Sequence, residues 1–387
     1  MKGSNNPDGW AWPFGCGNCG KDYPSQGFPY RCPTCGGHFD LVDGLSYAPG
    51  SGRGLERYRT SFPLPPGTGL ISLGEGGTPL LEENLAERTV YLKCEHLNPT
   101  GSFKDRGTAV LVSALKAAGV EQAVEDSSGN AGASFAAYAS RARISARVYV
   151  PEYASGPKRS QIEAYGAELV PIAGSRSATT EAALHAVDGG LVYASHAHMP
   201  HFVTGMATIA FEIAEALGRA PGTMVVPVGQ GTLLLGAYLG FKALMKAGVT
   251  ESVPALIGVQ AQACAPLWAE YEGDSVGIDG LQEQETIAEG IRTVQPLRGE
   301  AVLRAVDETG GMIVAVEEAE IERGVGELAR RGFLVEPTSA VIWPVLEHSL
   351  PQLQDPVVTV LTGSGFKSGH ESWPVGISSG VVERTKK

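Results

Sequence analysis

The chain has 387 residues, which is enough for two or three domains with a well-buried core. Hydrophobic residues make up 43% of it and charged residues 19%, so the composition is that of a folded protein and excludes a disordered one. The formal net charge of −12 argues against a nucleic-acid partner, because a phosphate backbone is normally met by a basic face.

The first eight residues, Met-Lys-Gly-Ser-Asn-Asn-Pro-Asp, contain no apolar core. A secretory signal requires such a core after its charged start. We therefore expect no secretory signal and a cytoplasmic location.

Four of the six cysteines form two pairs, Cys16 with Cys19 and Cys32 with Cys35, and twelve residues separate the pairs. Each Cys-x-x-Cys can form a tight knuckle, and two knuckles complete a tetrahedral shell of four thiolates around Zn²⁺. Four protein ligands leave no open position for a substrate. The spacing predicts a zinc ribbon whose metal is structural.

Two other interpretations of the cysteine pairs are weaker. Disulfides are rare in intracellular proteins. A nucleic-acid-binding ribbon would carry several basic residues, but only Lys21 and Arg31 lie between the first and last of the four cysteines. The remaining cysteines, Cys94 and Cys264, stand alone, and we expect them to be buried structural residues.

Gly, Pro and Ser residues punctuate 47–54 and 62–69, so the main body is expected to begin near residue 70. After this point, short apolar runs alternate with amphipathic stretches. The runs predict strands at 90–93, 146–150, 167–172, 223–226, 256–260 and 357–361. The amphipathic stretches predict helices at 107–118, 131–140, 207–217, 233–247 and 317–331. This alternation predicts an open α/β fold with parallel sheets.

The segment 98–107, Asn-Pro-Thr-Gly-Ser-Phe-Lys-Asp-Arg-Gly, places Lys104 in a glycine- and hydroxyl-rich turn that packing does not require. A lysine amine can form a Schiff base with a carbonyl, and pyridoxal phosphate is the commonest cofactor held in this way. Burial and a cationic neighbour such as Arg106 would lower the pKa of the amine. The alternative is a surface lysine that opens a helix.

The segment Ser127-Ser-Gly-Asn130 comes directly before a predicted helix. Backbone N–H groups and hydroxyls at a helix N-terminus can bind a carboxylate. The alternative is an ordinary helix cap formed by Ser or Asn.

The stretch 223–241 is nearly uncharged, but Pro227 and several glycines interrupt it, so it predicts a strand, a loop and a helix and not a membrane span. Its loop, Gly229-Gln-Gly-Thr-Leu-Leu-Leu-Gly236, would let several backbone N–H groups converge on a phosphate. A nucleotide site fits less well, because the loop has neither a dinucleotide-type acidic residue nor the Gly-Lys-Ser/Thr of a P-loop.

Thr362 ends the last predicted strand, at the edge of a parallel sheet where ligands bind. Its hydroxyl is a candidate ligand contact. The alternative is a plain strand-end threonine in a glycine-rich turn.

Six motifs together resemble those of the β-family (fold type II) pyridoxal-phosphate enzymes, and most closely the threonine synthases. The resemblance covers residues 70–370. The motifs are Gly74-Glu-Gly-Gly-Thr-Pro79, the Lys104 segment, Ser127-Ser-Gly-Asn-Ala-Gly132, Gly229-Gln-Gly-Thr-Leu-Leu-Leu-Gly236, Glu336-Pro-Thr-Ser-Ala340 and Thr362-Gly-Ser-Gly365. Threonine synthases often carry a small N-terminal zinc-binding module as well.

The resemblance implies two open parallel-sheet domains of the tryptophan synthase β-like architecture, with the cofactor between them. The expected organisation is a zinc ribbon and linker at 1–50, a large cofactor domain at 51–106 and 201–387, and a small substrate domain at 107–200. It also implies a homodimer and a small amino-acid substrate.

The resemblance further implies roles for individual residues. Lys104 would carry the cofactor and act as the base that removes the substrate Cα proton. Cofactor contacts would come from Asn130 (phenolic oxygen), Gly229, Gln230, Gly231 and Thr232 (phosphate) and Thr362 (ring nitrogen). The substrate carboxylate would be held by Ser127, Ser128, Gly129, Asn130 and Ala131.

The implied reaction converts O-phosphohomoserine and water into threonine and phosphate by γ-elimination and β-addition. It requires a second anion pocket, because the substrate carries its own phosphate. The candidates are Arg106, Ser155, Lys158, Arg159 and Lys367. Each of them could instead be a solvated surface residue.

Some positions depart from the usual threonine synthase pattern. Many synthases have Thr-Gly-Asn-Thr where this chain has Ser128-Gly-Asn-Ala131, an Asn-rich loop where it has Gln230-Gly-Thr, and a histidine at Ser364. These differences favour a threonine/serine dehydratase, or a β-replacement enzyme resembling cysteate or cysteine synthases. A non-catalytic small-molecule binding protein is the remaining alternative.

Overall fold

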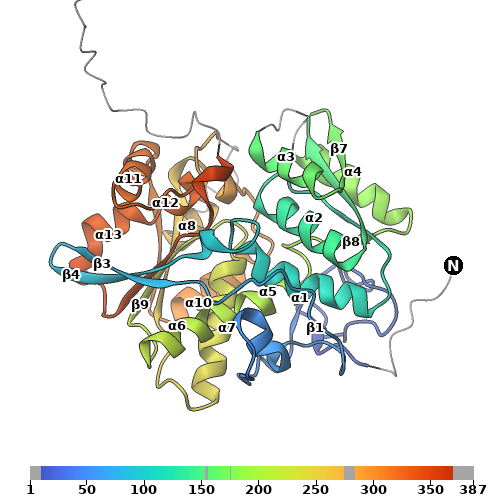
Figure 1. Cartoon of the computed structure of the whole chain (residues 1–387), viewed down its shortest axis with the longest axis horizontal. Helices are drawn as coiled ribbons and strands as arrows, with labels where there is room; N and C mark the ends of the chain where they lie inside the picture. The colour runs from blue at the N-terminus through green and yellow to red at the C-terminus, as the bar shows by residue number, and fades with distance from the viewer. Residues whose placement is uncertain (1–9, 153–155, 175, 274–283, 369–387) are drawn as a thin grey trace, which may run out of the picture.

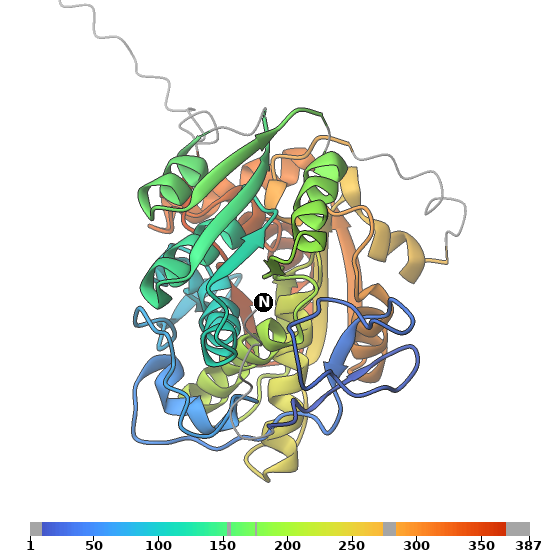
Figure 2. The same cartoon turned by 90° about the vertical axis from the view of Figure 1, so that its right-hand side faces the viewer.

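The computed structural model describes residues 10–152, 156–174, 176–273 and 284–368. Two α/β lobes lie side by side in it, one around a six-stranded sheet and one around a four-stranded sheet (Figure 1). A small N-terminal module with a two-stranded sheet packs beside them (Figure 2).

The large sheet has the strand order β11-β10-β9-β12-β4-β3. Its strands are β3 Leu80–Leu85, β4 Arg88–Lys93, β9 Thr223–Pro227, β10 Ala255–Ala261, β11 Met312–Val316 and β12 Val357–Val360. Every neighbouring pair is parallel except β3 and β4, which are antiparallel. The sheet is therefore mixed at this edge, where the sequence predicted parallel strands only.

The reason lies in the turn between β3 and β4. Leu85 pairs with Arg88, so only Ala86 and Glu87 connect the strands, with φ of 46° and 64°. A two-residue hairpin with positive φ at both positions matches the twist of its strands and forces antiparallel pairing.

The smaller sheet has the order β7-β6-β5-β8, and all of its strands are parallel. Its strands are β5 Gln122–Glu125, β6 Ser145–Pro151, β7 Glu168–Ile172 and β8 Val192–Tyr193. Helices α2 Asn130–Ala142, α3 Pro157–Ala164 and α4 Arg176–Asp188 connect these strands.

The helices of the rest of the molecule surround the large sheet and the junction of the lobes (Figure 1). They are α1 Lys104–Ala117, α5 Pro200–Met206, α6 Thr208–Leu217, α7 Thr232–Lys246, α8 Pro266–Tyr271, α10 Gly299–Glu308, α11 Glu318–Arg330, α12 Pro337–Ala340 and α13 Trp343–Ser349. Helix α1 packs against both α5 and α2, and α5 packs in turn against α7. This continuous packing places the start of α1 where the two lobes meet.

All of the strands and helices predicted from apolar periodicity are present within one to three residues at most ends. The prediction missed β3, β5, β8 and β11, the two ribbon strands, and several helices. Strand β5 has only four residues and ends at the acidic pair Glu125 and Asp126, so it lacks the apolar run that reveals a buried strand.

In the N-terminal module, β1 Phe14–Cys16 pairs with β2 Phe39–Leu41, and both lie against the body of the molecule. His201 of α5 is surrounded by the module's aromatic rings, with centroid distances of 4.7 Å to Trp12, 4.6 Å to Phe14 and 4.8 Å to Phe28. The module and the body therefore share one apolar core.

Candidate functional site

Three loops that are far apart in the sequence meet through backbone hydrogen bonds at the carboxyl ends of β4 and β12. The N–H of Phe103 donates to Thr362 O at 2.9 Å, and the N–H of Ser364 donates to Gly101 O at 2.9 Å. The N–H of Glu336 donates to Gly363 O at 3.0 Å. The loops that carry Lys104, Thr362 and Glu336 thus form a single framework.

Lys104 is the first residue of α1, and its side chain is partly buried. Its Nζ lies 4.7 Å from the ring centroid of Phe103 and 5.7 Å from that of Phe202. Burial lowers the pKa of the amine to about 8, although the charges of Glu125 and Glu336 act in the opposite direction. More of Lys104 is therefore neutral, and nucleophilic, near neutral pH than of an ordinary lysine.

Arg106 does not play the part expected from the sequence. Its guanidinium is fully buried and bonds to Glu95 Oε2 at 2.7 Å, to Glu212 Oε2 at 2.7 Å and to Thr208 Oγ1 at 2.9 Å. Its donors are thus occupied by the chain itself, and desolvation rather than Arg106 lowers the pKa of Lys104. This geometry supports a structural role for Arg106 instead of contact with a substrate phosphate.

The segment 127–129 is partly exposed and leads into α2, whose first residue is Asn130. The first-turn N–H groups of a helix have no intrahelical partner, so those of Asn130 and Ala131 are available for an anion. A Cβ at Gly132 would come within 1.8 Å of Ser127 O, so only glycine allows the loop to fold back onto the helix. This arrangement suits a carboxylate, as the sequence predicts.

Asn130 is tied to Glu336 from the other lobe. Its Nδ2 donates to Glu336 Oε1 and to Glu336 Oε2, both at 2.9 Å, while its buried Oδ1 has no hydrogen-bond partner among the described residues. A buried unpaired acceptor is costly, so it indicates a missing polar partner. A polar ligand group placed between the lobes would supply one.

The loop Gly229–Thr232 follows β9 and precedes α7, a helix of 15 residues. Gly231 has φ of 80°, and a Cβ there would come within 2.2 Å of Val302. Gln230 instead uses its side chain within the protein, where Oε1 accepts from the N–H of Leu297 at 3.0 Å. The free N–H groups and the dipole at the start of α7 suit a phosphate.

Thr362 is buried at the end of β12, and its Oγ1 lies 2.9 Å from Ser339 Oγ of α12. Ser339 Oγ also accepts the N–H of Gly363 at 3.0 Å. The two hydroxyls thus form a short chain that orients Thr362, and Ser339 is a participant that sequence reasoning missed.

Of the remaining candidates for a substrate-phosphate pocket, Lys158 and Lys367 lie close to Glu336. Lys158 Nζ is 3.3 Å from Glu336 Oε2, and Lys367 Nζ donates to Thr100 O at 2.7 Å. Burial lowers the pKa of Lys367 to about 8, despite the charges of Glu336 and Asp105. Ser155 lies outside the described residues.

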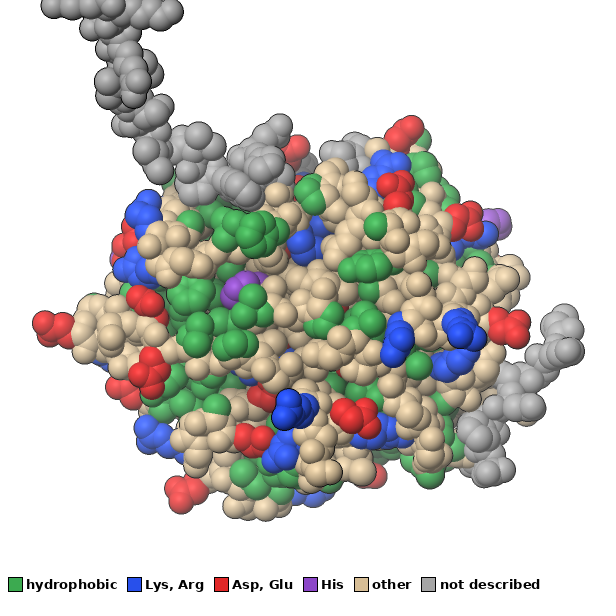
Figure 3. Space-filling view, viewed as in Figure 1, with side chains coloured by type: hydrophobic (Ala, Val, Ile, Leu, Met, Phe, Trp, Pro, Cys, Tyr) green, Lys and Arg blue, Asp and Glu red, His purple; other side chains and the backbone are tan. Residues whose placement is uncertain are grey.

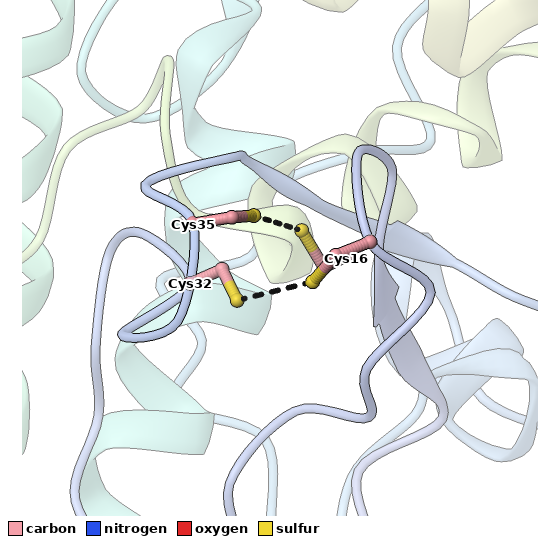
Figure 4. A group of neighbouring side chains, drawn as sticks. Cys16, Cys32 and Cys35 are labelled. Atoms are coloured by element: carbon pink, nitrogen blue, oxygen red, sulfur yellow. Dashed lines mark hydrogen bonds between the residues drawn. The ribbon is translucent and has the colours of Figure 1, made fainter.

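The four ribbon cysteines converge, and their Sγ atoms all lie within 4.8 Å of one another. Cys16 and Cys35 are 3.4 Å apart, and Cys19 and Cys32 are 3.7 Å apart (Figure 4). A tetrahedral zinc site with Zn–S bonds of about 2.3 Å requires sulfur atoms about 3.8 Å apart, so the four thiols fit a zinc ion. None of the four forms a disulfide.

Sequence reasoning also missed a polar group beside Lys104. Glu125, at the end of β5, bonds to His196 from the segment before α5, with 2.8 Å between Oε1 and Nδ1. Glu336 and Ser339 at least fell within a recognised motif, whereas Glu125 and His196 belong to none. The one local signal for this polar group is the acidic pair Glu125-Asp126, which directly precedes the Ser127 segment in the sequence.

The residues assembled here fit pyridoxal phosphate: an amine of lowered pKa at Lys104, an unpaired acceptor at Asn130, a phosphate-type helix start at α7 and a hydroxyl at Thr362. In the described part of the chain, no helix is long and apolar enough to cross a membrane.

Comparisons with known proteins indicate the same cofactor. Residues 71–363 match a family model described as "Pyridoxal-phosphate dependent enzyme". A threonine synthase from Methanocaldococcus jannaschii is 33% identical over 374 residues, which cover 91% of this chain and 92% of the relative. A threonine synthase from Synechocystis sp. is 34% identical over 326 residues, which cover 81% of this chain and 83% of the relative.

Solved structures show the same fold. A threonine deaminase from T.th. has a TM-score of 0.64 and 28% identity, covering 74% of this chain and 92% of that one. A maize serine racemase, at 19% identity, has a TM-score of 0.63 and covers 74% of this chain and 88% of that one. The fold type II architecture predicted from the motifs is confirmed. By its sequence match and its fold, the chain belongs to the pyridoxal-phosphate dependent enzyme family.

Proposed function

We propose that the protein converts O-phosphohomoserine and water into threonine and inorganic phosphate. The observation that carries this proposal is the 33% identity to a threonine synthase along 91% of the chain. In this reaction the C–O bond at Cγ breaks, and the oxygen of water bonds to Cβ. Protons leave Cα and Cβ, and protons return to Cα and Cγ.

Bound pyridoxal phosphate would supply an electron sink that makes the protons near the substrate nitrogen acidic. Lys104 would hold the cofactor, and its amine, once released, would accept the Cα proton at Nζ. The start of α7 would hold the cofactor phosphate, through Gly229, Gly231 and Thr232. A hydroxyl such as that of Thr362 hydrogen-bonds a ring nitrogen without keeping it protonated, which suits elimination and replacement more than transamination.

The substrate would lie between the lobes. Its carboxylate would be bound by the N–H groups of the segment 127–131, and its phosphate would be near Lys158 and Lys367. Each of these lysines carries three N–H donors and lies near Glu336 at the junction of the lobes, so two cations in an otherwise acidic chain support a phosphorylated substrate there.

Three parallel incubations test the reaction. The purified protein, loaded with cofactor, is given O-phosphohomoserine, threonine or O-phosphoserine, and phosphate, threonine and 2-oxo acids are measured. We expect phosphate and threonine in equal amounts from the first substrate. The variant Lys104→Ala should lose both the product and the visible absorbance of the cofactor imine.

A threonine or serine dehydratase is the second candidate, because a threonine deaminase shares the fold at 28% identity. This enzyme would release 2-oxobutanoate from threonine and would not require a phosphate pocket. Formation of 2-oxobutanoate from threonine, with no turnover of O-phosphohomoserine, would replace the synthase proposal by this one.

A structural Zn²⁺ in the ribbon is part of the proposal, and the sulfur distances and the absence of disulfides among these four cysteines support it. Elemental analysis of the purified protein should find one zinc per chain. The double variant Cys16→Ser/Cys19→Ser should contain none. A wild-type protein without metal, but with titratable free thiols, would contradict this assignment.

We also propose a cytoplasmic homodimer. Leu97 and Phe366 follow the adjacent strands β4 and β12, and they are 58% and 74% exposed. Figure 3 shows apolar side chains grouped on one face of the larger lobe, with charged side chains toward the rim. Light scattering should give twice the chain mass, and Phe366→Glu should shift it toward the monomer; a wild-type monomer would contradict the dimer.

A further inference from the structure

The buried carboxylate of Glu125 has an unusual set of partners. Its Oε1 lies 2.8 Å from His196 Nδ1, and its Oε2 accepts the N–H of Ser127. The neighbouring Asp126 is neutralised by Arg176, at 3.0 Å. Among the described residues, Glu125 forms no such ion pair with an arginine or lysine.

His196 and Lys104 lie against the same aromatic ring. The ring centroid of His196 is 5.9 Å from that of Phe202, and Lys104 Nζ is 5.7 Å from the Phe202 centroid. The side chain of His196 is 16% exposed, so the imidazole is not sealed in the core. The three polar groups therefore lie close enough for their charges to interact, although they come from β5, α1 and the segment before α5.

The groups also interact through their charges. Burial lowers the pKa of His196, and the charge of Lys104 lowers it further, so the imidazole is neutral near pH 7. The Glu125 charge stabilises the ammonium form of Lys104, as does that of Glu336 from the segment before α12. A neutral imidazole with Nδ1–H directed at Glu125 donates a hydrogen bond to the carboxylate.

The negative charge of the buried Glu125 carboxylate, next to the Ser127 loop, needs a physical explanation. Ser127, whose N–H bonds Glu125, belongs to the loop proposed to bind the substrate carboxylate. Two nearby carboxylates repel each other. The charge of Arg176 also interacts with that of Glu125, but the direct ion pair of Arg176 is with Asp126, and a buried carboxylate without such a pair is costly. The arrangement becomes more favourable when a positive charge appears near Glu125, which happens when Lys104 Nζ takes a proton.

We propose that Glu125 and His196 form a positioning pair that stabilises the ammonium form of Lys104 after it accepts a substrate proton, an inference that rests on the proposed role of Lys104 as base. The proton moves from the substrate Cα to Lys104 Nζ and later returns to the substrate, so none is consumed. Glu125 supplies the charge, and His196 holds the carboxylate in place.

The test uses the full-length protein and pyridoxal phosphate alone, without any amino-acid substrate. The rate of imine formation at Lys104 is followed by absorbance as a function of pH, because only the neutral amine reacts. In Glu125→Gln, which preserves shape, the apparent pKa of this rate should fall by about one unit. Glu121→Gln, an exposed acid directly before the same strand, should leave the profile unchanged.

Two further variants separate the role of His196 from a structural one. His196→Gln retains a donor to Glu125 and should behave as wild type, whereas His196→Leu should shift the profile as Glu125→Gln does. The double variant Glu125→Gln/His196→Leu should shift it no further, because His196 acts through Glu125. Circular dichroism confirms that each variant is folded.

A wild-type profile in folded Glu125→Gln would overturn the proposal, and so would additive shifts in the double variant. If Glu125→Gln does not fold, the pH profiles of His196→Leu and His196→Gln are compared instead. A wild-type profile in folded His196→Leu would then overturn the proposal. Because no substrate is present, these outcomes are independent of whether threonine is the product.

Discussion

The guanidinium of Arg298 lies 2.8 Å from Asp40 Oδ1 and so joins the N-terminal ribbon to the body of the molecule. Burial opposes ionisation of Asp40, but the hydrogen bond from His38 and the charge of Arg298 outweigh it and lower its pKa to about 2. The same guanidinium donates to Phe39 O in the ribbon and to Ala197 O and His198 O in the body. Ala197 and His198 directly follow His196 in the chain, so Arg298 joins the ribbon to the segment that carries His196.

Replacing Arg298 should therefore destabilise both the ribbon and the His196 segment. Arg298→Met removes the donor to three carbonyls, and the free energy of unfolding should fall by about 2–4 kcal/mol. Denaturant titration measures this loss, and hydrogen exchange should show faster exchange at residues 194–199. Arg304→Met, an exposed arginine on α10, is the matched control. An unchanged unfolding midpoint in Arg298→Met would contradict the stabilising role of Arg298 between the ribbon and the body.

Removing Arg106 should cost more stability than removing any surface arginine. Its loss leaves Glu95 and Glu212 buried, and among the described residues Lys93 is then the cation paired with them, at 2.6 Å from Glu212 Oε2. Breaking a buried ion pair in this way costs about 3–5 kcal/mol. Urea unfolding of Arg106→Met against Arg141→Met, at the exposed end of α2, measures the difference. A stable Arg106→Met with a raised KM for O-phosphohomoserine would instead restore the substrate role expected from the sequence.

Lys158 should affect the phosphorylated substrate selectively. Lys158→Met removes a cation beside Glu336, and the KM for O-phosphohomoserine should rise about tenfold or more, which corresponds to one charge-assisted hydrogen bond. The absorbance of the bound cofactor should not change. Lys116→Met, an exposed lysine near the end of α1, is the control. Equal KM values for wild type and Lys158→Met would place the phosphate pocket elsewhere.

The contact between ribbon and body should weaken in mild acid because of His201. This imidazole is fully buried among aromatic rings, and burial lowers its pKa to about 3. An unfolded histidine has a pKa near ~6.5, so the unfolded state binds the proton first as the pH falls. The stability due to neutral His201 is therefore complete above pH ~6.5 and is lost progressively toward pH ~3, by about 2 kcal/mol at pH ~5.

His201→Phe tests this pH dependence, because it retains an aromatic ring and cannot be protonated. Unfolding free energies at pH ~7 and ~5 should differ by less in this variant than in wild type, by the same proton linkage. His185→Gln, an exposed histidine of α4, should follow wild type. If the unfolding free energy fell by the same amount in wild type and in His201→Phe, the acid would act on other groups, for example on the ribbon thiols.

Much of the site could be predicted because its signals are local. Lys104 in its turn, the glycine loop before α7, the Ser-Ser-Gly-Asn segment and the spaced cysteines each place several functional groups within a few residues of one another. Sites of this kind can be predicted without a structure. The backbone conformation that they require is set by nearby glycines, by hydroxyl residues and by the start of a helix.

The sequence by itself thus determined the family chemistry, the helices and strands with clear apolar periodicity, and the candidate metal ligands. Only the tertiary structure decided how charges are shared. It buried Arg106 among Glu95 and Glu212, and it brought Glu125 to His196 and Asn130 to Glu336 across 71 and 206 residues of chain. The energy of a buried charge depends on which partners lie within a few ångströms, and that distance is a property of the fold and not of any local pattern.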